Sequence, residues 1–161
     1  MTERSRVVEW DDPLETAAGA RDRTGLEFLQ ALAAGELPAP PILHTVGFRL
    51  VSVDAGTVVF ALDPAEYHYN PIGSVHGGVY ATLLDSAAGC AVHSMLPAGV
   101  GYTSLDLSVK FLGAVRVGSG ALTCTGTVTH LGKRTALAEA RLQDASGRLL
   151  ATATSSCLIV A

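Results

Sequence analysis

The chain has 161 residues, of which 48% are hydrophobic and 16% are charged, and it carries a net charge of −4 at pH 7. This length predicts one domain with a real core, and so apolar a composition predicts that further surface is buried between subunits. Because the chain has no block of Lys or Arg, neither nucleic acid nor an anionic membrane is expected as a partner. Its longest apolar run, residues 79–92, is interrupted by Asp85 and is too short to cross a bilayer.

The first 23 residues are polar and mixed, which predicts a flexible N-terminal arm (1–23) ahead of a single domain over residues 24–161. The arm lacks the apolar stretch of a signal peptide. Three cysteines, Cys90, Cys124 and Cys157, lie far apart and form no CxxC pair. They are therefore predicted to be reduced, buried thiols, and the protein is predicted to be cytoplasmic.

A leading helix and a proline-rich link are predicted over residues 24–41. Thr24 can cap a helix over residues 25–34, and Gly35 ends it. The three prolines that follow within the link prevent the helix from continuing.

The remainder of the chain is predicted to be strands arranged around one long helix. From Ile42 the pattern changes to that of a β-strand. The last three strands are separated by short glycine-containing turns, which predict an antiparallel meander. One long apolar helix facing one antiparallel sheet is an α+β architecture. Strands are predicted over residues 48–53, 57–62, 101–112, 119–130, 134–144 and 148–160, and the long helix over residues 77–95.

The stretch of residues 70–85, NPIGSVHGGVYATLLD, combines two features that point to chemistry. A polar, glycine-rich loop that leads into a helix N-terminus suits an anion or a developing oxyanion. Asp85 is a carboxylate inside a helix otherwise built for burial, which is costly unless the carboxylate has a function or a partner. Together they indicate chemistry at a carbonyl group. From the residues alone, a catalytic Asp85 and an Asp85 paired within a dimer interface are equally supported.

The other residues of this stretch each have a second interpretation. The N–H of Gly77 could donate to an oxyanion, or the glycine could serve only close packing, which suits Gly78 better. Asn70 is either a donor to the carbonyl or a turn residue. The histidines, His76 among them, show no paired ligand spacing, so no metal is expected. Ser104, on a strand, either holds a water beside Asp85 or faces outward.

The spacing of Gly77 and Asp85 predicts a dimer. Eight residues of helix span about 12 Å, whereas a reacting carbonyl needs its oxygen donor and its nucleophile each about 3 Å away. If both groups act on one carbonyl, they must come from different chains related by a two-fold axis. The sequence thus predicts a shared site, with Asn70, His76 and Gly77 from one subunit and Asp85 and Ser104 from the other.

These residues occur in a recognisable order. The set Asn70, Gly73, His76-Gly77-Gly78, Asp85 and the strand 102–107, within this order of elements, resembles the hotdog-fold acyl-CoA thioesterases, and in particular their PaaI-like (phenylacetyl-CoA thioesterase-like) branch. The resemblance extends over roughly residues 24–160 and includes the segment 25–42 and the turn 132–134. It implies a helix wrapped by a curved sheet, homodimers with a continuous sheet that pair into homotetramers, and hydrolysis of acyl-CoA without metal or cofactor.

The resemblance also assigns roles to individual residues. Asp85 takes the position of the catalytic carboxylate, and His76 that of a supporting group at the carbonyl-binding end. The expected catalytic set is Asp85, Gly77, Asn70, His76 and Ser104, and the expected substrate-binding set is Gly78, Tyr102, Lys133 and Arg134.

Several alternatives stay open. Lys133 and Arg134 could contact CoA phosphates or could simply be a solvated hairpin tip. The acyl group could be aromatic or a short to medium aliphatic chain. Two other functions remain as alternatives: a non-catalytic acyl-CoA-binding hotdog protein, and a hotdog hydratase or dehydratase.

Overall fold

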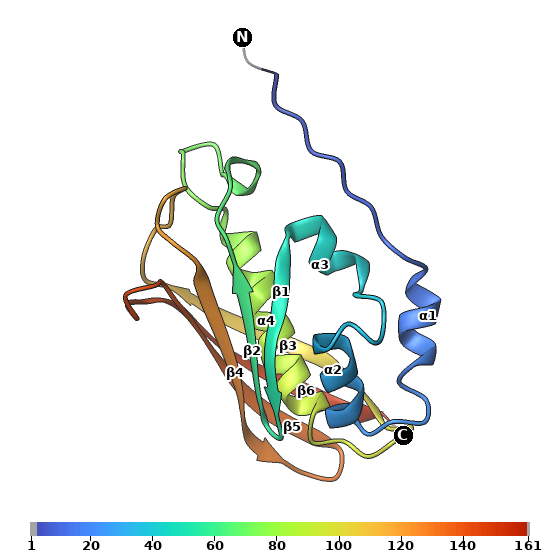
Figure 1. The fold of residues 1–161 in the computed structure, drawn as a ribbon. Coiled ribbons are helices and arrows are strands. Elements are labelled where there is room, and N and C mark those ends of the chain that lie inside the picture. The colour runs from blue at the N-terminus through green and yellow to red at the C-terminus, as the bar shows by residue number, and fades with distance from the viewer. Residues whose placement is uncertain (1–2, 161) are drawn as a thin grey trace.

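A curved antiparallel sheet wraps around one long helix in the computed structural model, which describes residues 3–160 (Figure 1). The sheet has six strands in the order β1-β2-β4-β5-β6-β3, and every pair is antiparallel. The α+β hotdog fold predicted from the sequence is confirmed. The strands are β1 (Phe48–Asp54), β2 (Thr57–Leu62), β3 (Gly101–Phe111), β4 (Leu122–Leu131), β5 (Thr135–Gln143) and β6 (Leu149–Val160).

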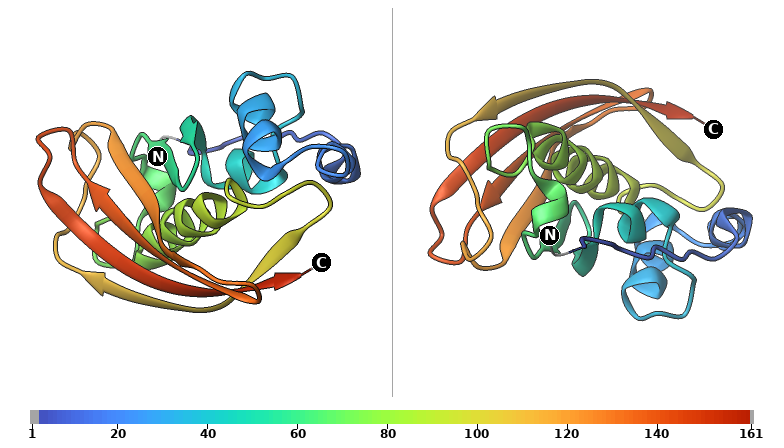
Figure 2. Two further views of the ribbon diagram at one scale, coloured as in Figure 1. Left: turned by 90° about the horizontal axis from the view of Figure 1, so that it is seen from below. Right: turned by 90° about the horizontal axis from the view of Figure 1, so that it is seen from above.

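The long helix α4 (Gly77–His93) lies between the sheet and the short helices. The sheet covers one side of α4, and the short helices lie toward its other side (Figure 2). The predicted meander is confirmed as β4-β5-β6. The strand β3, which precedes these three in the chain, pairs with β6 and forms one edge of the sheet. The remaining helices are α1 (Pro13–Ala18), α2 (Gly25–Ala33), α3 (Pro41–Val46) and the short 3-10 helix η1 (Glu66–His68).

The core lies between α4 and the concave face of the sheet. The face of α4 toward the sheet carries small and medium apolar side chains, and six of them are fully buried. Small residues at this face let the helix approach the strands closely. The six are Leu83, Leu84, Ala87, Ala88, Ala91 and Val92.

The contact between α4 and β4 depends on Gly126. A Cβ atom on Gly126 would lie 2.1 Å from the carbonyl oxygen of Ala87, so no side chain fits there. We expect Gly126→Ala to lower the free energy of unfolding by about 3 kcal/mol or more, because helix and sheet must separate. Thr127→Ala, a change at the adjacent exposed residue, is the control. Equal urea midpoints for the two variants would contradict this account of the packing.

The leading helix is confirmed as α2. The Thr24 hydroxyl accepts a hydrogen bond from the Glu27 N–H at 3.2 Å, and the Glu27 carboxylate accepts one from the Thr24 N–H at 2.8 Å. This reciprocal capping box fixes the start of the helix.

The prediction of a strand from Ile42 is wrong. Residues 41–46 form α3, and β1 begins at Phe48. Pro41 stands at the first helical position, where a missing N–H costs nothing. Gly47, at φ 86°, adopts the left-handed conformation that ends a helix.

The predicted arm contains a helix. Asp12 caps α1, and the buried Thr16 hydroxyl donates to the Pro38 carbonyl at 2.9 Å. This part of the arm is therefore attached to the proline-rich link. The division into an arm and a domain at residue 24 stays a prediction, and its outer ends, residues 1, 2 and 161, lie outside the described residues.

Candidate active site

Asp85 projects from the middle of α4. The prediction that it is buried is wrong for the single chain: Asp85 is exposed, while its neighbour Leu84 is fully buried on the sheet side. Its carboxylate accepts a hydrogen bond from the Ser104 hydroxyl at 3.1 Å. The structure thus brings together the two residues that the sequence assigned to one half of the site.

A β-bulge explains why Ser104 reaches Asp85. The register of β3 against β6 shifts between Ser104 and Asp106. Ser104 pairs with the buried Cys157 and faces α4, and after the bulge Leu107 also faces inward, although the two are three residues apart. The extra residue, Leu105, is 58% exposed. Bulges re-aim side chains in this way, and strict alternation would have put Ser104 and Leu107 on opposite faces.

Asp85 lies on the wall of a cavity of about 600 Å³. The cavity is bounded by α4 and by the leading segment of the chain, and Cys90 and Tyr102 also line it. Burial raises the pKa of the Cys90 thiol to about 12 and raises the pKa of Tyr102 well above its ordinary value. Both groups are therefore neutral near pH 7, and Asp85 is the residue that supplies a carboxylate to this cavity. Tyr102 and Asp85 line the same cavity, and the substrate-binding role of Tyr102 stays a prediction.

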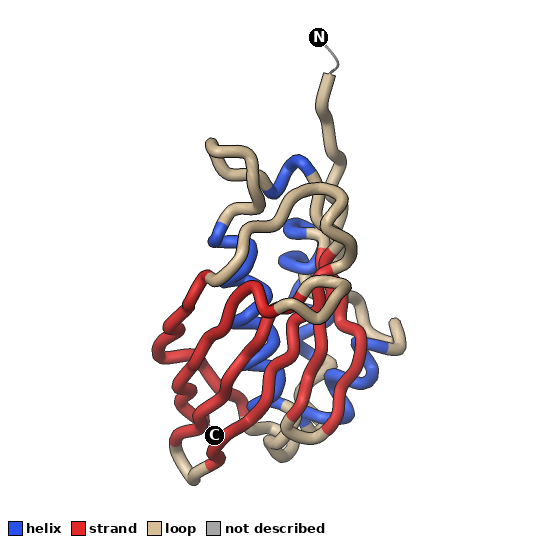
Figure 3. Tube along the Cα trace, turned by 90° about the vertical axis from the view of Figure 1, so that its left-hand side faces the viewer, coloured by secondary structure: helices blue, strands red, loops and turns tan. Residues whose placement is uncertain are grey.

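A second pocket lies at the N-terminus of α4. It has a volume of about 380 Å³, and Asn70, Gly77, Tyr80 and Phe111 are among its lining residues. The loops over residues 64–76 and 112–121 lie at the same end of the sheet (Figure 3), and the Val75 N–H donates to the Val115 carbonyl at 2.9 Å across them. Asn70 and Gly77, predicted to share one half of the site, do share this pocket.

The first turn of α4 leaves one N–H group for a ligand. His76 caps the helix: its Nδ1 accepts the Gly78 N–H at 2.8 Å, and its carbonyl accepts the Val79 N–H at 2.9 Å. Among residues 3–160 the N–H of Gly77 has no such acceptor, and a helix offers none at this position. A Cβ atom at Gly77 would lie 3.1 Å from the Phe111 ring, so glycine leaves room for this ring beside the start of the helix.

His76 and Asn70 hold the loop. Because Nδ1 of His76 accepts a hydrogen bond, Nε2 is the ring nitrogen left to donate one. The Asn70 side-chain oxygen accepts the N–H groups of Ile72 and Ser74, and its amide donates to the Ser74 hydroxyl at 3.1 Å. These bonds favour the turn interpretation of Asn70, which also lines the second pocket. The catalytic role of Asn70 stays a prediction.

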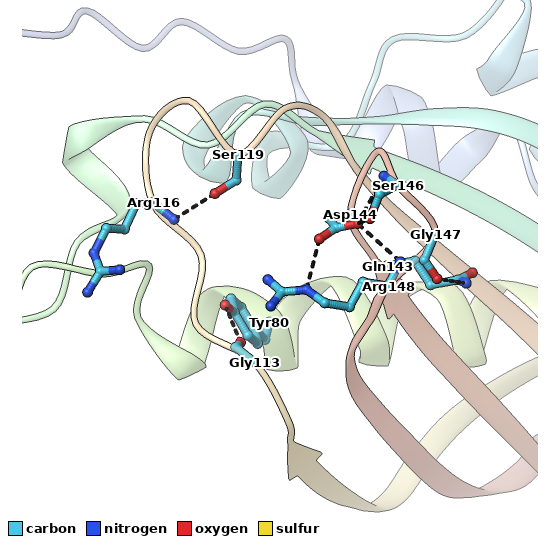
Figure 4. Close-up of polar contacts among 9 residues, drawn as sticks. All are labelled: Tyr80, Gly113, Arg116, Ser119, Gln143, Asp144, Ser146, Gly147 and Arg148. Carbon is cyan, nitrogen blue, oxygen red and sulfur yellow. Dashed lines mark hydrogen bonds and ion pairs between the residues drawn. The ribbon is translucent and has the colours of Figure 1, made fainter.

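The basic pair Lys133 and Arg134 lies in the turn between β4 and β5 and lines neither pocket. Arg148, which the sequence analysis did not single out, lies close to the second pocket. Gly113 lines this pocket, and a Cβ atom built on Gly113 would lie 3.9 Å from the guanidinium carbon of Arg148. Arg148 is held by Asp144 at 3.1 Å, next to the bond from Tyr80 to the Gly113 carbonyl (Figure 4). Hydrogen bonds from Ser146 and Arg148, of which the bond from the Ser146 hydroxyl has the largest effect, lower the pKa of Asp144 to about 2. Only the tertiary structure shows this proximity.

Within one chain the two candidate groups, Gly77 and Asp85, are far apart. Gly77 and Asp85 are at the start and in the middle of one unbroken helix, about 12 Å apart along its axis, and they open into different cavities. Within residues 3–160 there is no cluster of three or more His, Cys, Asp or Glu side chains suited to a metal ion. No helix in this part of the chain is long and apolar enough to span a membrane.

The hotdog fold, with Gly77 at the start of its central helix and Asp85 in the middle, agrees with the class of thioesterases that the sequence predicts. Comparison with known proteins agrees: the model of the thioesterase superfamily matches residues 72–151, and the chain belongs to this superfamily.

Two curated relatives and two solved structures illustrate the similarity. The 1,4-dihydroxy-2-naphthoyl-CoA hydrolase of Listeria monocytogenes is 32% identical over 66% of this chain and 85% of its own length. Human acyl-coenzyme A thioesterase 13 is 31% identical over 63% of this chain and 72% of its own. The E. coli PaaI protein of the phenylacetic acid degradation operon shares the fold, with a TM-score of 0.74 at 22% identity, covering 86% of this chain and 96% of its own. The Streptococcus mutans protein smu.793, solved with acetyl-CoA bound, has a TM-score of 0.65 at 25% identity, covering 70% of this chain and 88% of its own.

Proposed function

We propose that the protein hydrolyses acyl-CoA thioesters, with aromatic or short to medium acyl groups, to a free acid and CoA. The observation that carries the proposal is that one helix bears both an exposed Asp85, bonded to Ser104, and a Gly77 N–H with no acceptor among residues 3–160. The names of the relatives, a naphthoyl-CoA hydrolase and an acyl-CoA thioesterase, support the substrate class.

The proposed reaction uses both half-sites. The carbonyl oxygen of the thioester accepts a hydrogen bond from the Gly77 N–H, and the helix N-terminus stabilises the negative charge that develops there. Asp85 either attacks the carbonyl carbon, giving a mixed anhydride that water opens, or takes a proton from a water that attacks. In both routes the carbon–sulfur bond breaks. CoA departs as a thiolate, a good leaving group, so no strong general acid is needed.

We propose that each complete site is shared by two subunits of a homodimer, which pairs further into a homotetramer. One subunit supplies Asp85 and Ser104, and Gly77 of the partner subunit supplies the oxyanion donor. The helix length supports this, because one α4 cannot bring both groups to one carbonyl. The outer edge of β3, which pairs with β6 on its other side, is the edge on which a continuous sheet would form.

The proposed activity is tested by following CoA release with a thiol reagent over phenylacetyl, hydroxybenzoyl, acetyl, hexanoyl and palmitoyl thioesters. Turnover of at least one, with the free acid and CoA formed in equal amounts, is expected. Tight binding of CoA esters without turnover would instead support the non-catalytic acyl-CoA-binding protein. Addition or loss of water at the acyl chain, with the thioester intact, would support the hydratase.

The shared site predicts complementation. Asp85→Asn and Gly77→Pro homodimers should each be nearly inactive, and subunit exchange between them should restore activity. A mixed dimer has one intact site and one doubly altered site, so random exchange gives about a quarter of the wild-type activity per subunit. Exchange is followed with differently tagged chains. Confirmed mixed dimers without recovered activity would contradict a shared site.

A further inference from the structure

We propose, on the basis of the function proposed above, that the 600 Å³ cavity beside Asp85 is the acyl pocket and that the leading segment of the chain sets its selectivity. The segment concerned runs from Arg6 through α2 and α3 to β1. The pocket takes an apolar acyl group, either a one- or two-ring aromatic or a medium-length chain.

The chemistry of the walls supports this assignment. Asp85 and Ser86 of α4 lie on one wall, so an acyl group whose carbonyl carbon is next to Asp85 can enter directly. The other walls are mostly apolar and come from α2, α3, β1 and β2, so burying hydrocarbon there is favourable. The apolar residues that bear on the argument are Leu29, Leu32, Leu43, Phe48, Leu50 and Phe60.

The size of the cavity limits the acyl group. Cavities of about 300–1,000 Å³ hold small-molecule ligands in proteins, which fits a ring system or a medium chain here. The inner wall of the cavity is formed by Phe48 of β1 and Phe60 of β2. This wall is tightly packed, because both side chains are buried and their ring centroids are 5.4 Å apart. A long straight chain such as palmitoyl would have to leave the cavity.

Arg6 contacts α3, which forms the wall of the cavity that we call its roof. Its guanidinium donates to the carbonyls of His44 and Thr45 at the end of α3 and stacks on the Tyr67 ring at 4.2 Å. Arg6 itself lines the cavity, whereas the nearby Arg4 pairs with Glu66 on the surface and does not. The N-terminal arm thus contacts the end of α3 beside the pocket.

Most residues that line the cavity precede the part of the chain that the superfamily model matches. The superfamily match begins at residue 72, whereas the roof and the inner wall precede that residue. Asp85 and the acyl pocket belong to the same subunit, and Gly77 of the partner subunit would act on the oxygen. The second pocket, which is smaller and contains the Gly77 N–H, is then left for the thioester end of CoA.

The test changes the volume of each pocket at one leucine. Leu43 lines the proposed acyl pocket and is half-buried, and Leu112 lines the second pocket and is 59% exposed. We expect Leu43→Phe to lower kcat/KM for octanoyl-CoA about tenfold relative to butyryl-CoA, and Leu43→Ala to shift the optimum toward longer chains. Leu112→Phe and Leu112→Ala should leave the chain-length profile unchanged. Arg6→Ala should broaden the profile, and Arg4→Ala should not.

Each other outcome decides against the proposal. A profile that moves with Leu112 would assign the acyl group to the second pocket, and a profile that moves with neither residue would remove the cavity from selectivity. If no thioester is hydrolysed, the proposed function fails first. The pocket is then judged by calorimetric binding of non-hydrolysable butyryl and octanoyl thioethers of CoA to the same variants. Affinity ratios unaffected by Leu43 would overturn it, and thermal unfolding of each variant verifies its fold.

Discussion

Asp85→Asn is expected to lower kcat by about two powers of ten or more while KM changes little. The amide has nearly the shape of the carboxylate and can still accept the Ser104 hydroxyl, which lies 3.1 Å from the carboxylate. It can neither attack a carbonyl nor take a proton from water. The substrate contacts remain, so the loss falls on the chemical step. Steady-state kinetics on the best acyl-CoA of the wild type measure it.

The matched control is Asp54→Asn. Asp54 is an exposed carboxylate at the end of β1 and lines neither pocket. It should retain full kcat, which separates the loss of a particular carboxylate from a general effect of net charge. An Asp85→Asn enzyme with wild-type kcat would remove Asp85 from the mechanism.

The second large effect is expected at Gly77. Gly77→Pro removes the N–H that we assign to the oxyanion and should lower kcat by about 10²–10³, as the loss of one such donor does in other enzymes. Proline suits the first position of a helix, and His76 before it has the extended backbone, φ −66° and ψ 139°, that proline requires. The fold is therefore expected to survive, and thermal unfolding measures this.

Gly77→Ala separates the donor from the added volume. Both substitutions place a Cβ about 3.1 Å from the Phe111 ring, which is 57% exposed and free to move, but only proline lacks the N–H. Alanine should therefore retain most of the activity. If the two variants are equally impaired, the contact with Phe111 and not the hydrogen bond is what matters at this position.

Much of this protein is determined by local sequence patterns. The Thr24 cap of α2 and the glycine turns between the strands each depend on a few consecutive residues, and the structure places them as predicted. The motif of residues 70–85 is also determined locally. The relative positions of His76, Gly77 and Asp85 follow from the geometry of one helix. Local hydrogen bonding and helical periodicity suffice to place such features.

Other features were decided by contacts between distant parts of the chain. Proline and glycine at the ends of residues 41–47 favour a short helix, but the apolar residues between them suit a strand equally well. The orientation of Ser104 depends on a bulge against β6, some fifty residues further along the chain, and no pattern within β3 reveals it.

Asp85 shows most clearly the difference between what the local sequence determines and what tertiary contacts determine. The sequence identified the carboxylate, but periodicity alone indicated burial, because nearly every neighbour on α4 is apolar. The structure leaves Asp85 exposed beside a cavity whose walls come from α2, α3, β1 and β2. A cavity is the space that remains after several elements have packed together. Its volume therefore depends on tertiary distances, whereas the identity of the reactive group depends only on the residue at position 85.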